Sequence, residues 1–274
     1  MKREDIIKRM AELGPWTSHN IKIRPDDGDP IYTISPDWRK YNVYLLHRIL
    51  QIIQDVYGSL DILPKLKILD IGCCEGMYSI NLARLGAYVV GIEGRRALFE
   101  KANFISKEID DKSFCYAHMD IRELEASHCE YPDIALCLGV LYLLEPPEAF
   151  KLLKKISEIT KKVAIFYTHE VKPEQETEIE YEGEMYKGKV SKNYPPGYPV
   201  EKQETHHNRG WGAYGCEESF WISEESLIRY LTKHGFTSFY EMKYPKLKLI
   251  TIDKTFVAIK GEDTFKYIEE LYSK

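Results

Sequence analysis

The chain carries the sequence ILDIGCCEG at residues 68–76, and a helical pattern begins directly after it at Met77. The opening residues are mostly apolar, as in a buried strand, and a turn of small residues follows between Gly72 and Gly76. A strand that enters a helix through such a turn lets the backbone approach a nucleotide closely. The stretch therefore predicts a nucleotide-binding turn, and a tight turn without a ligand is the alternative interpretation.

A second apolar strand, VVGIE at residues 89–93, ends in Glu93, about 20 residues after the turn. A carboxylate at that place can accept hydrogen bonds from both ribose hydroxyls of a nucleoside. The dinucleotide pattern G-x-G-x-x-G is absent because position 74 is a cysteine, and Asp70 lies just before the turn. An acid there suits the positive sulfonium and amino groups of S-adenosylmethionine better than a diphosphate. A methyl donor is therefore favoured over a dinucleotide.

Apolar segments of strand length alternate with helical segments through the middle of the chain. Such strands, separated by helices, are typical of a parallel sheet that is covered on both faces. With two closing strands near the end of the chain, we expect an α/β fold with a mostly parallel seven-stranded sheet. The expected strands are 67–71, 88–93, 114–119, 133–138, 163–167, 236–242 and 247–260. One helix is expected to begin at Met77, and further helices are expected over 95–109, 147–160, 224–234 and 263–272.

The flanking segments suggest a division into four parts. Helices over 2–13 and 38–57 predict an N-terminal helical extension, residues 1–58, before the cofactor-binding core, residues 59–168. Residues 169–220 show no sustained period but are rich in aromatic side chains, and a loop this long is functional or disordered. We expect an inserted lid or substrate segment, residues 169–222, over the carboxyl ends of the strands. The C-terminal part of the core is residues 223–274.

Residues 69–76 resemble motif I of the class I S-adenosylmethionine-dependent methyltransferases, L-D-x-G-C-G-x-G, with Cys74 replacing the middle glycine. Glu93 matches the ribose-binding acid of that family, and Asp120 matches the residue that meets the adenine amino group. Residues 133–142 resemble the fourth-strand motif beside the methyl group. The resemblance implies a Rossmann-like class I methyltransferase fold with S-adenosylmethionine as its cofactor. It implies cofactor contacts from Asp70, Gly72, Cys74, Gly76, Glu93, Gly94, Asp120, Ile121, Leu138 and Tyr142.

A narrower resemblance points to the branch that includes the tRNA wobble-uridine carboxymethyltransferase. It rests on G-V-L-Y at residues 139–142 and on the upstream stretch 33–48, which contains Trp38 and Arg39. Related uncharacterised and sugar- or metabolite-modifying methyltransferases share three further motifs, which are here W-x-x-H-x-I at residues 16–21, S-F-W at residues 219–221 and G-F at residues 235–236. No basic cluster for the extra carboxylate of a carboxymethyl donor is recognisable before Trp38, so we expect plain S-adenosylmethionine. A carboxymethyl or other group transferase acting on tRNA, and a non-catalytic cofactor-binding partner subunit, remain alternatives.

Methyl transfer is an in-line displacement, so the protein must mainly position the acceptor and remove its proton. His169 is the candidate base, with a polar residue that satisfies the strand end as its alternative role. Tyr142 is the second catalytic candidate, with an aromatic packed under the lid as the alternative. We expect a small-molecule acceptor, contacted by Trp16, His19, Trp38, Tyr186, Trp211 and Trp221. The residues of the N-terminal extension among them have packing against the sheet as their alternative role.

Composition narrows the remaining classes of partner. A net charge of −5 with scattered Lys and Arg disfavours nucleic acid. The six cysteines show neither C-x-x-C pairs nor zinc-site spacing, so we expect reduced thiols and no metal. No apolar run approaches the roughly 20 residues that span a bilayer, and residues 1–10 carry mixed charges. A cytoplasmic protein that does not contact membranes is expected, and the sequence indicates neither the acceptor nor the oligomeric state.

Overall fold

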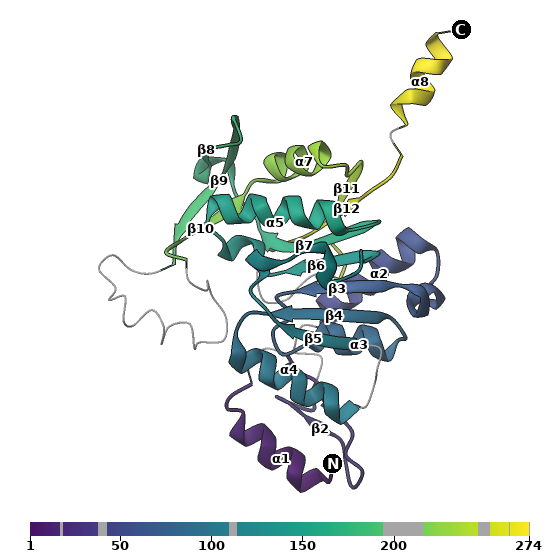
Figure 1. Cartoon of the computed structure of the whole chain (residues 1–274), viewed down its shortest axis with the longest axis vertical. Helices are drawn as coiled ribbons and strands as arrows, with labels where there is room; N and C mark the ends of the chain where they lie inside the picture. The colour runs from purple at the N-terminus through teal and green to yellow at the C-terminus, as the bar shows by residue number, and fades with distance from the viewer. Residues whose placement is uncertain are drawn as a thin grey trace.

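The computed structural model describes residues 1–16, 19–37, 43–109, 114–193, 216–245, 253–262 and 264–273. Its centre is a seven-stranded sheet in the order β11-β12-β7-β6-β3-β4-β5 (Figure 1). The parallel strands are β3 (Lys67–Ile71), β4 (Tyr88–Glu93), β5 (Phe114–His118), β6 (Ile134–Leu138) and β7 (Val163–His169). Strand β12 (Asp253–Ile259) pairs with β7 in antiparallel orientation, and β11 (Ser238–Glu241) pairs with β12 in antiparallel orientation. The predicted α/β fold with a mostly parallel seven-stranded sheet is confirmed.

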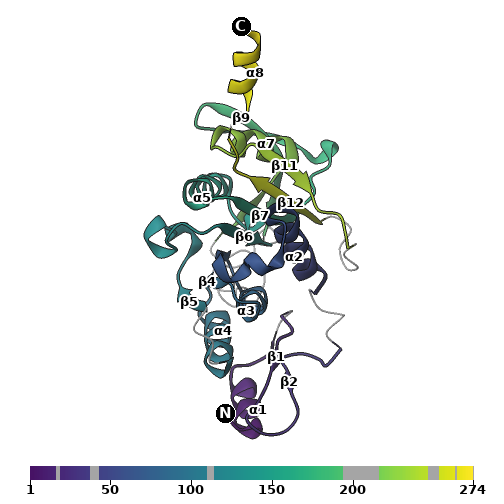
Figure 2. The same cartoon turned by 90° about the vertical axis from the view of Figure 1, so that its right-hand side faces the viewer.

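Successive residues of the central strands point into two different cores, as the two-residue period of a strand requires. Leu69 packs on the face covered by α5 (Pro146–Ile159) and α7 (Glu224–Lys233). Ile68 packs on the face covered by α2 (Val43–Tyr57), α3 (Met77–Arg84) and α4 (Arg96–Ile109). Figure 2 shows α5 and α2 on opposite sides of the sheet. Both cores are apolar, and burial of each large side chain contributes roughly 1.5–3 kcal/mol.

The N-terminal extension packs on the α3–α4 side of the sheet. It consists of α1 (Arg3–Glu12) and a hairpin of β1 (Lys22–Ile23) and β2 (Ile31–Tyr32). Ile6, Ile21 and Ile23 are fully buried in the same core as α4. The predicted first helix is thereby confirmed. The described part of the predicted second helix begins at Val43, since residues 38–42 lie outside the described residues.

The expectation that residues 169–220 lack regular structure was wrong for much of the segment. Strands β8 (Thr177–Tyr181), β9 (Glu184–Lys192) and β10 (Glu218–Ile222) form a separate three-stranded antiparallel sheet. The turn between β8 and β9 is Glu182 and Gly183, with φ angles of 51° and 78°. Two successive left-handed residues match the twist of a hairpin, although a glutamate is an unusual first residue for it. Residues 194–215 lie outside the described part of the chain.

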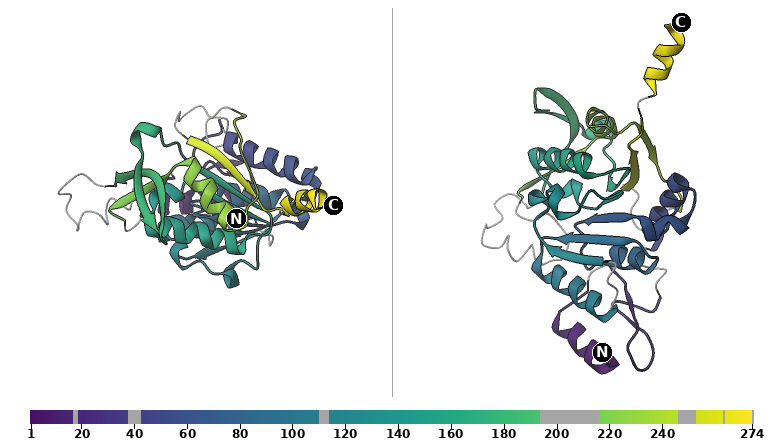
Figure 3. Two further views of the ribbon diagram at one scale, coloured as in Figure 1. Left: turned by 90° about the horizontal axis from the view of Figure 1, so that it is seen from above. Right: turned by 45° about the vertical axis from the view of Figure 1, so that its right-hand side comes forward.

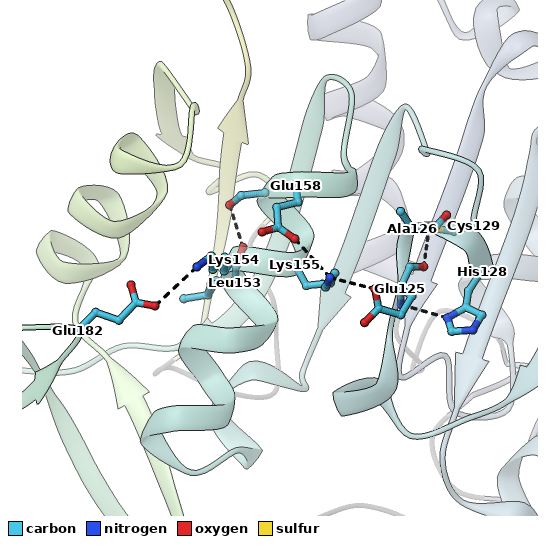
Figure 4. A network of polar contacts seen from close by, with 10 residues as sticks. Glu125, Ala126, His128, Cys129, Leu153, Lys154, Lys155, Glu158 and Glu182 are labelled. Carbon is cyan, nitrogen blue, oxygen red and sulfur yellow. Dashed lines mark hydrogen bonds and ion pairs between the residues drawn. The ribbon is translucent and has the colours of Figure 1, made fainter.

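The small sheet is joined to the α5–α7 side of the molecule. On β9, the Lys187 amide donates to the Ser226 hydroxyl of α7 at 2.8 Å. Lys154 of α5 forms an ion pair with Glu182 at 3.6 Å, which Figure 4 shows beside the pairing of Lys155 with glutamates on both sides. On β10, the Phe220 amide donates to the Leu144 carbonyl at 2.8 Å, just beyond the carboxyl end of β6. The part of the insertion formed by β10 therefore reaches the edge at which a lid was predicted.

Helix α8 (Phe265–Tyr272) stands apart from the sheet beyond β12, as Figure 3 shows. Short 3-10 turns occur at Leu60–Lys65, Ile121–Glu123, Ala126–His128, Leu141–Leu143 and Pro173–Gln175. Among the described residues, no helix combines the length and apolar character needed to cross a membrane. The division into four parts stays a prediction.

Candidate functional site

The turn after β3 depends on backbone conformations that favour glycine. Gly72 and Gly76 have φ angles of 69° and 84°. A Cβ atom on Gly76 would lie 2.2 Å from the Tyr116 hydroxyl, and one on Gly72 would lie 2.4 Å from Val140. Cys74 adopts a left-handed φ of 55°, which a cysteine reaches only at a cost. The loop thus keeps a left-handed path at position 74, where the family motif has glycine.

Glu93, at the end of β4, supports this turn through hydrogen bonds. Its Oε2 accepts a hydrogen bond from the Cys74 amide at 2.9 Å, and its Oε1 accepts one from the Arg95 amide at 2.8 Å. The residue is 6% exposed, and burial raises the pKa of its carboxyl group. A carboxylate has about four lone-pair sites, so about two remain for ligand hydroxyls. Gly94 follows, and its carbonyl lies 3.1 Å from His118 Nε2.

Asp70 lies deeper, at the end of β3, and is 1% exposed. Its Oδ2 accepts a hydrogen bond from the Ser79 hydroxyl of α3 at 2.6 Å. Burial raises the pKa of Asp70 to about 6. An ionised acid in this position favours a positively charged neighbour, because such a neighbour offsets the cost of burying the charge. Its predicted place near the sulfonium and amino groups of the cofactor stays a prediction.

Asp120 follows β5 and is already bound to a neighbouring arginine. Its Oδ1 accepts hydrogen bonds from the Arg122 amide at 2.9 Å and from Arg122 Nε at 3.0 Å. Burial alone would raise the pKa of Asp120, but the Arg122 hydrogen bonds and charge outweigh it and lower the pKa. Ile121 is half-buried against the α5-side core, and Leu138 is half-buried against the other core. An adenine contact would have to use the remaining lone pairs of Asp120.

A group of polar and aromatic side chains meets where β7 ends. His169 Nδ1 and the Tyr167 hydroxyl are both hydrogen-bonded to the Asp253 carboxylate, one to each oxygen. The His169 ring stacks on Tyr142, with centroids 3.8 Å apart, and lies 4.3 Å from the Trp221 ring. The histidine side chain remains 15% exposed. Three predicted site residues, Tyr142, His169 and Trp221, are thereby brought together.

The carboxylate of Asp253 was missed by the sequence analysis. The expected strand 247–260 contains the residue, but only the register of β12 against β7 places it directly opposite His169. A second missed feature is the buried pair of Lys101 and Glu75, 3.2 Å apart. Lys101 also donates to the Pro15 carbonyl and lies 5.4 Å from the Trp16 ring centroid. This lysine therefore connects α4, the turn after β3 and the N-terminal extension.

The N-terminal candidates lie against the same turn. His19 is buried, and its Nδ1 accepts a hydrogen bond from the Met77 amide at 3.2 Å at the start of α3. Burial lowers the pKa of His19 to about 4. Trp16 is half-buried, and its indole donates to the Met10 carbonyl at 3.3 Å. The His19 contact attaches the extension to the end of the turn, whereas the Trp16 hydrogen bond lies within the extension itself. Packing of the extension against the turn is the alternative role that the sequence left open.

Tyr186 does not belong to this group. It is 1% exposed on β9, and its ring packs between Phe150 of α5 and Tyr230 of α7. Its hydroxyl donates to Glu184 at 3.0 Å. Tyr186 was predicted to contact the acceptor, and the structure instead places its side chain in the core. The reason is that the hairpin turns this face of β9 towards α5 and α7. Trp38 and Trp211 lie outside the described residues.

The described residues contain no group of three or more His, Cys, Asp and Glu side chains arranged to hold an ion. None of the six cysteines, all of which lie in the described ranges, forms a disulfide. Burial raises the pKa of the Cys73 and Cys137 thiols, which keeps them protonated.

Residues 68–163 match the family described as "Methyltransferase domain". Ubiquinone biosynthesis O-methyltransferase of Hahella chejuensis is 32% identical over 102 residues, covering 37% of this chain and 42% of that protein. The enzyme of the same name from Rickettsia canadensis is 30% identical over 147 residues, covering 54% of this chain and 57% of that protein. The chain thus spans about half the length of the curated relatives it matches.

Solved structures extend the likeness to nearly the whole chain. The N-terminal domain of EvdMO1, crystallised in the presence of SAH and D-fucose, has a TM-score of 0.66 at 20% identity, covering 96% of this chain and 98% of that one. Magnesium protoporphyrin IX methyltransferase from Synechocystis PCC 6803, with bound SAH, has a TM-score of 0.52 at 16% identity, covering 86% and 90%. At these identities the likeness establishes the fold, which is that of the class I methyltransferases.

Proposed function

We propose that this chain, whose core carries a methyltransferase domain in the class I fold, is an S-adenosylmethionine-dependent methyltransferase acting on a small molecule. One observation carries the proposal. The turn supported by Glu93 and the His169–Asp253 pair lie at the same edge of the sheet, since each follows the carboxyl end of a parallel strand. In open α/β sheets this edge binds ligands. The proposal therefore assigns the donor site and the proton acceptor to the same edge of the sheet.

The residues of the turn fit a nucleoside that carries a positive charge. Glu93 retains lone pairs for ribose hydroxyls, and Asp70 offers a buried negative charge next to the turn. The glycines at positions 72 and 76 carry no side chain, so the backbone of the turn can approach a ligand closely. When bound, S-adenosylmethionine supplies a methyl group activated by its sulfonium. We assign Asp70, Gly72, Cys74, Gly76, Glu93, Gly94, Asp120, Ile121, Leu138 and Tyr142 to its binding.

His169 is the residue that we assign to the acceptor proton. Its Nδ1 is bound to Asp253, so its Nε2, on the other side of the ring, is the nitrogen available to a ligand. As an acceptor hydroxyl loses its proton to Nε2, the oxygen lone pair forms the bond to the methyl carbon. Bound S-adenosylmethionine would supply this methyl group, and its sulfur would keep the electron pair of the bond to that carbon as a neutral thioether. A base placed in this way contributes about 10²–10⁴-fold to a rate.

The surroundings of His169 favour a small acceptor with an oxygen nucleophile. Tyr142 and Trp221 present aromatic surface, and Lys189 Nζ lies 4.5 Å from the Trp221 ring centroid. Rings with polar tips suit a compact, partly polar molecule. The names of the curated relatives, which are O-methyltransferases, support oxygen as the attacked atom. We include Trp221, Trp16 and His19 as residues near the acceptor, and we propose a cytoplasmic location on composition alone.

Calorimetry with purified protein tests the proposal directly. S-adenosylhomocysteine is expected to bind with measurable heat and to raise the melting temperature, since ligands that bind the folded state stabilise it. Absence of both effects with this ligand and with S-adenosylmethionine would contradict the proposal. Mass spectrometry of any donor that copurifies separates a methyl donor from a carboxymethyl donor. Cofactor binding without transfer to any hydroxylated small molecule would favour a non-catalytic partner subunit.

A further inference from the structure

We infer that Asp253, itself oriented by Tyr167, is a positioning residue that keeps the proton of neutral His169 on Nδ1 and so leaves Nε2 free as the base. The base role of His169 rests on the function proposed above. The position of the proton does not, because it follows from the hydrogen bonds of three side chains on β7 and β12.

The sheet itself brings the three side chains together. Tyr167 and His169 are two residues apart on β7, so their side chains lie on the same face. Asp253 is the antiparallel partner of His169 in the register of β12 with β7. A residue opposite His169 is also diagonal to Tyr167, which lies two residues away on the same strand. A side chain as long as tyrosine can reach across that diagonal. The contacts of Asp253 with both residues are therefore built into the strand pairing.

The hydrogen bonds determine which nitrogen carries the proton. An ionised carboxylate only accepts hydrogen bonds, so Nδ1 must be the donor to Asp253 Oδ1. The Tyr167 hydroxyl donates to Oδ2, which is the other oxygen. Asp253 is buried, with a side chain 1% exposed, so water does not replace either contact. Neutral His169 is thereby held in the Nδ1–H form, with the lone pair on Nε2.

Replacing Asp253 by asparagine should reverse this arrangement. The amide oxygen would accept from the Tyr167 hydroxyl, and the amide NH₂ would face His169 Nδ1. If the amide were turned the other way, its NH₂ would face Tyr167, and the hydrogen of the Tyr167 hydroxyl would have no acceptor among the described residues. A buried donor without an acceptor costs free energy, so this orientation is disfavoured. In the Asp253→Asn variant the histidine proton therefore moves to Nε2. If Tyr167→Phe is added, the amide can turn round and the original form can return.

The experiment combines ¹⁵N NMR of the histidine ring with methyl-transfer rates. Spectra are recorded without cofactor in mildly alkaline solution, and a His169→Gln variant identifies the His169 signals among those of the eight histidines. We expect the Nδ1–H form in the unmodified protein and in Tyr167→Phe, and the Nε2–H form in Asp253→Asn. In the double variant the Nδ1–H form should return in part.

The rates should follow the position of the proton. Asp253→Asn is expected to lower kcat by about 10²–10⁴-fold with an unchanged Kd for S-adenosylhomocysteine. Tyr167→Phe should lower it by less than about 10-fold, and the double variant should be faster than Asp253→Asn alone. Asp133→Asn is the matched control, because that carboxylate accepts from the Lys67 amide at the opposite end of the sheet.

An Nε2–H form in the unmodified protein would overturn the inference even if Asp253→Asn failed to fold. A double variant as slow as Asp253→Asn, with the Nδ1–H form present in both, would also overturn it. Failure of the proposed function looks different: S-adenosylhomocysteine then binds to none of the proteins, while the NMR result is unaffected.

Discussion

Glu93 supports the turn through hydrogen bonds and is also assigned to the ribose of the cofactor. Its two oxygens accept from the Cys74 and Arg95 amides, and its free lone pairs are assigned to ribose. Glu93→Gln places an NH₂ group against one of these amides, so one hydrogen bond is lost. We expect at least about 10-fold weaker binding of S-adenosylhomocysteine, equivalent to about 1.4 kcal/mol. Calorimetry measures this, with Asp55→Asn on the exposed side of α2 as control. Equal affinities for the two variants would remove the ribose role.

His19 should make stability depend on pH. The pKa of His19 is lowered from 6.5 to about 4 by burial, so as the pH falls the unfolded chain takes up this proton first. The contribution of neutral His19 is fully present above about pH 6.5 and is lost as the pH falls towards about 4, by about 3 kcal/mol at most.

The comparison for this prediction is His19→Asn, whose Oδ1 can still accept from the Met77 amide but does not titrate. Asp70, with its pKa raised to about 6, has the opposite dependence and is common to both proteins, so the difference between them isolates His19. Free energies of unfolding in urea, measured from neutral to acid pH, give this difference. Parallel curves for the two proteins would show that His19 is not the group responsible.

At the level of the elements, the chain offers two glycines that share a backbone conformation and differ in their surroundings. Gly76, before α3, and Gly183, between β8 and β9, have φ angles of 84° and 78°. A Cβ atom at Gly183 meets nothing within 4 Å, whereas one at Gly76 lies 2.2 Å from the Tyr116 hydroxyl. We expect Gly183→Ala to cost about 1–2 kcal/mol in unfolding free energy from the left-handed conformation alone.

Gly76→Ala should cost more, by a further 1–3 kcal/mol or so, because Tyr116 or the turn must shift. Cofactor affinity should fall with it, whereas Gly183→Ala should leave that affinity unchanged. Urea unfolding and calorimetry on the two variants provide the measurements. If both substitutions had equal effects, the close approach at Gly76 would not matter to the turn.

The elements also show what the sequence can predict. Strands 67–71 and 88–93 were predicted with the bounds observed, because each is a short apolar run between turn signals. The β8–β9 hairpin was missed because Glu182-Gly183 is a weak turn signal and the exposed strands carry many charges. The partners of His169 and Lys101 were missed for another reason. Both depend on contacts between segments distant in sequence, which local patterns do not encode.

In the molecule as a whole, the three-stranded sheet is part of the main body rather than a separable cover. Tyr186 links this sheet to the main body, because its side chain is buried against both α5 and α7. Tyr186→Ala should cost about 3–5 kcal/mol in unfolding free energy, as other large aromatic truncations in cores do. Tyr186→Phe, which loses only the hydroxyl contact with Glu184, should cost about 1 kcal/mol and leave KM for the acceptor unchanged. A raised KM in Tyr186→Phe with unaltered stability would restore the original assignment.

The position of β12 between β7 and β11 has a consequence for timing. A ribosome makes the chain from its N-terminus, so the strands that hold Glu93 and the turn emerge long before Asp253 does. Until β12 has been synthesised and has paired with β7, β7 is the edge of the sheet and His169 lacks the carboxylate of Asp253. On the function proposed above, a nascent polypeptide would therefore gain the ability to hold a nucleoside early. It would gain the oriented base only once Asp253 has been added to the chain.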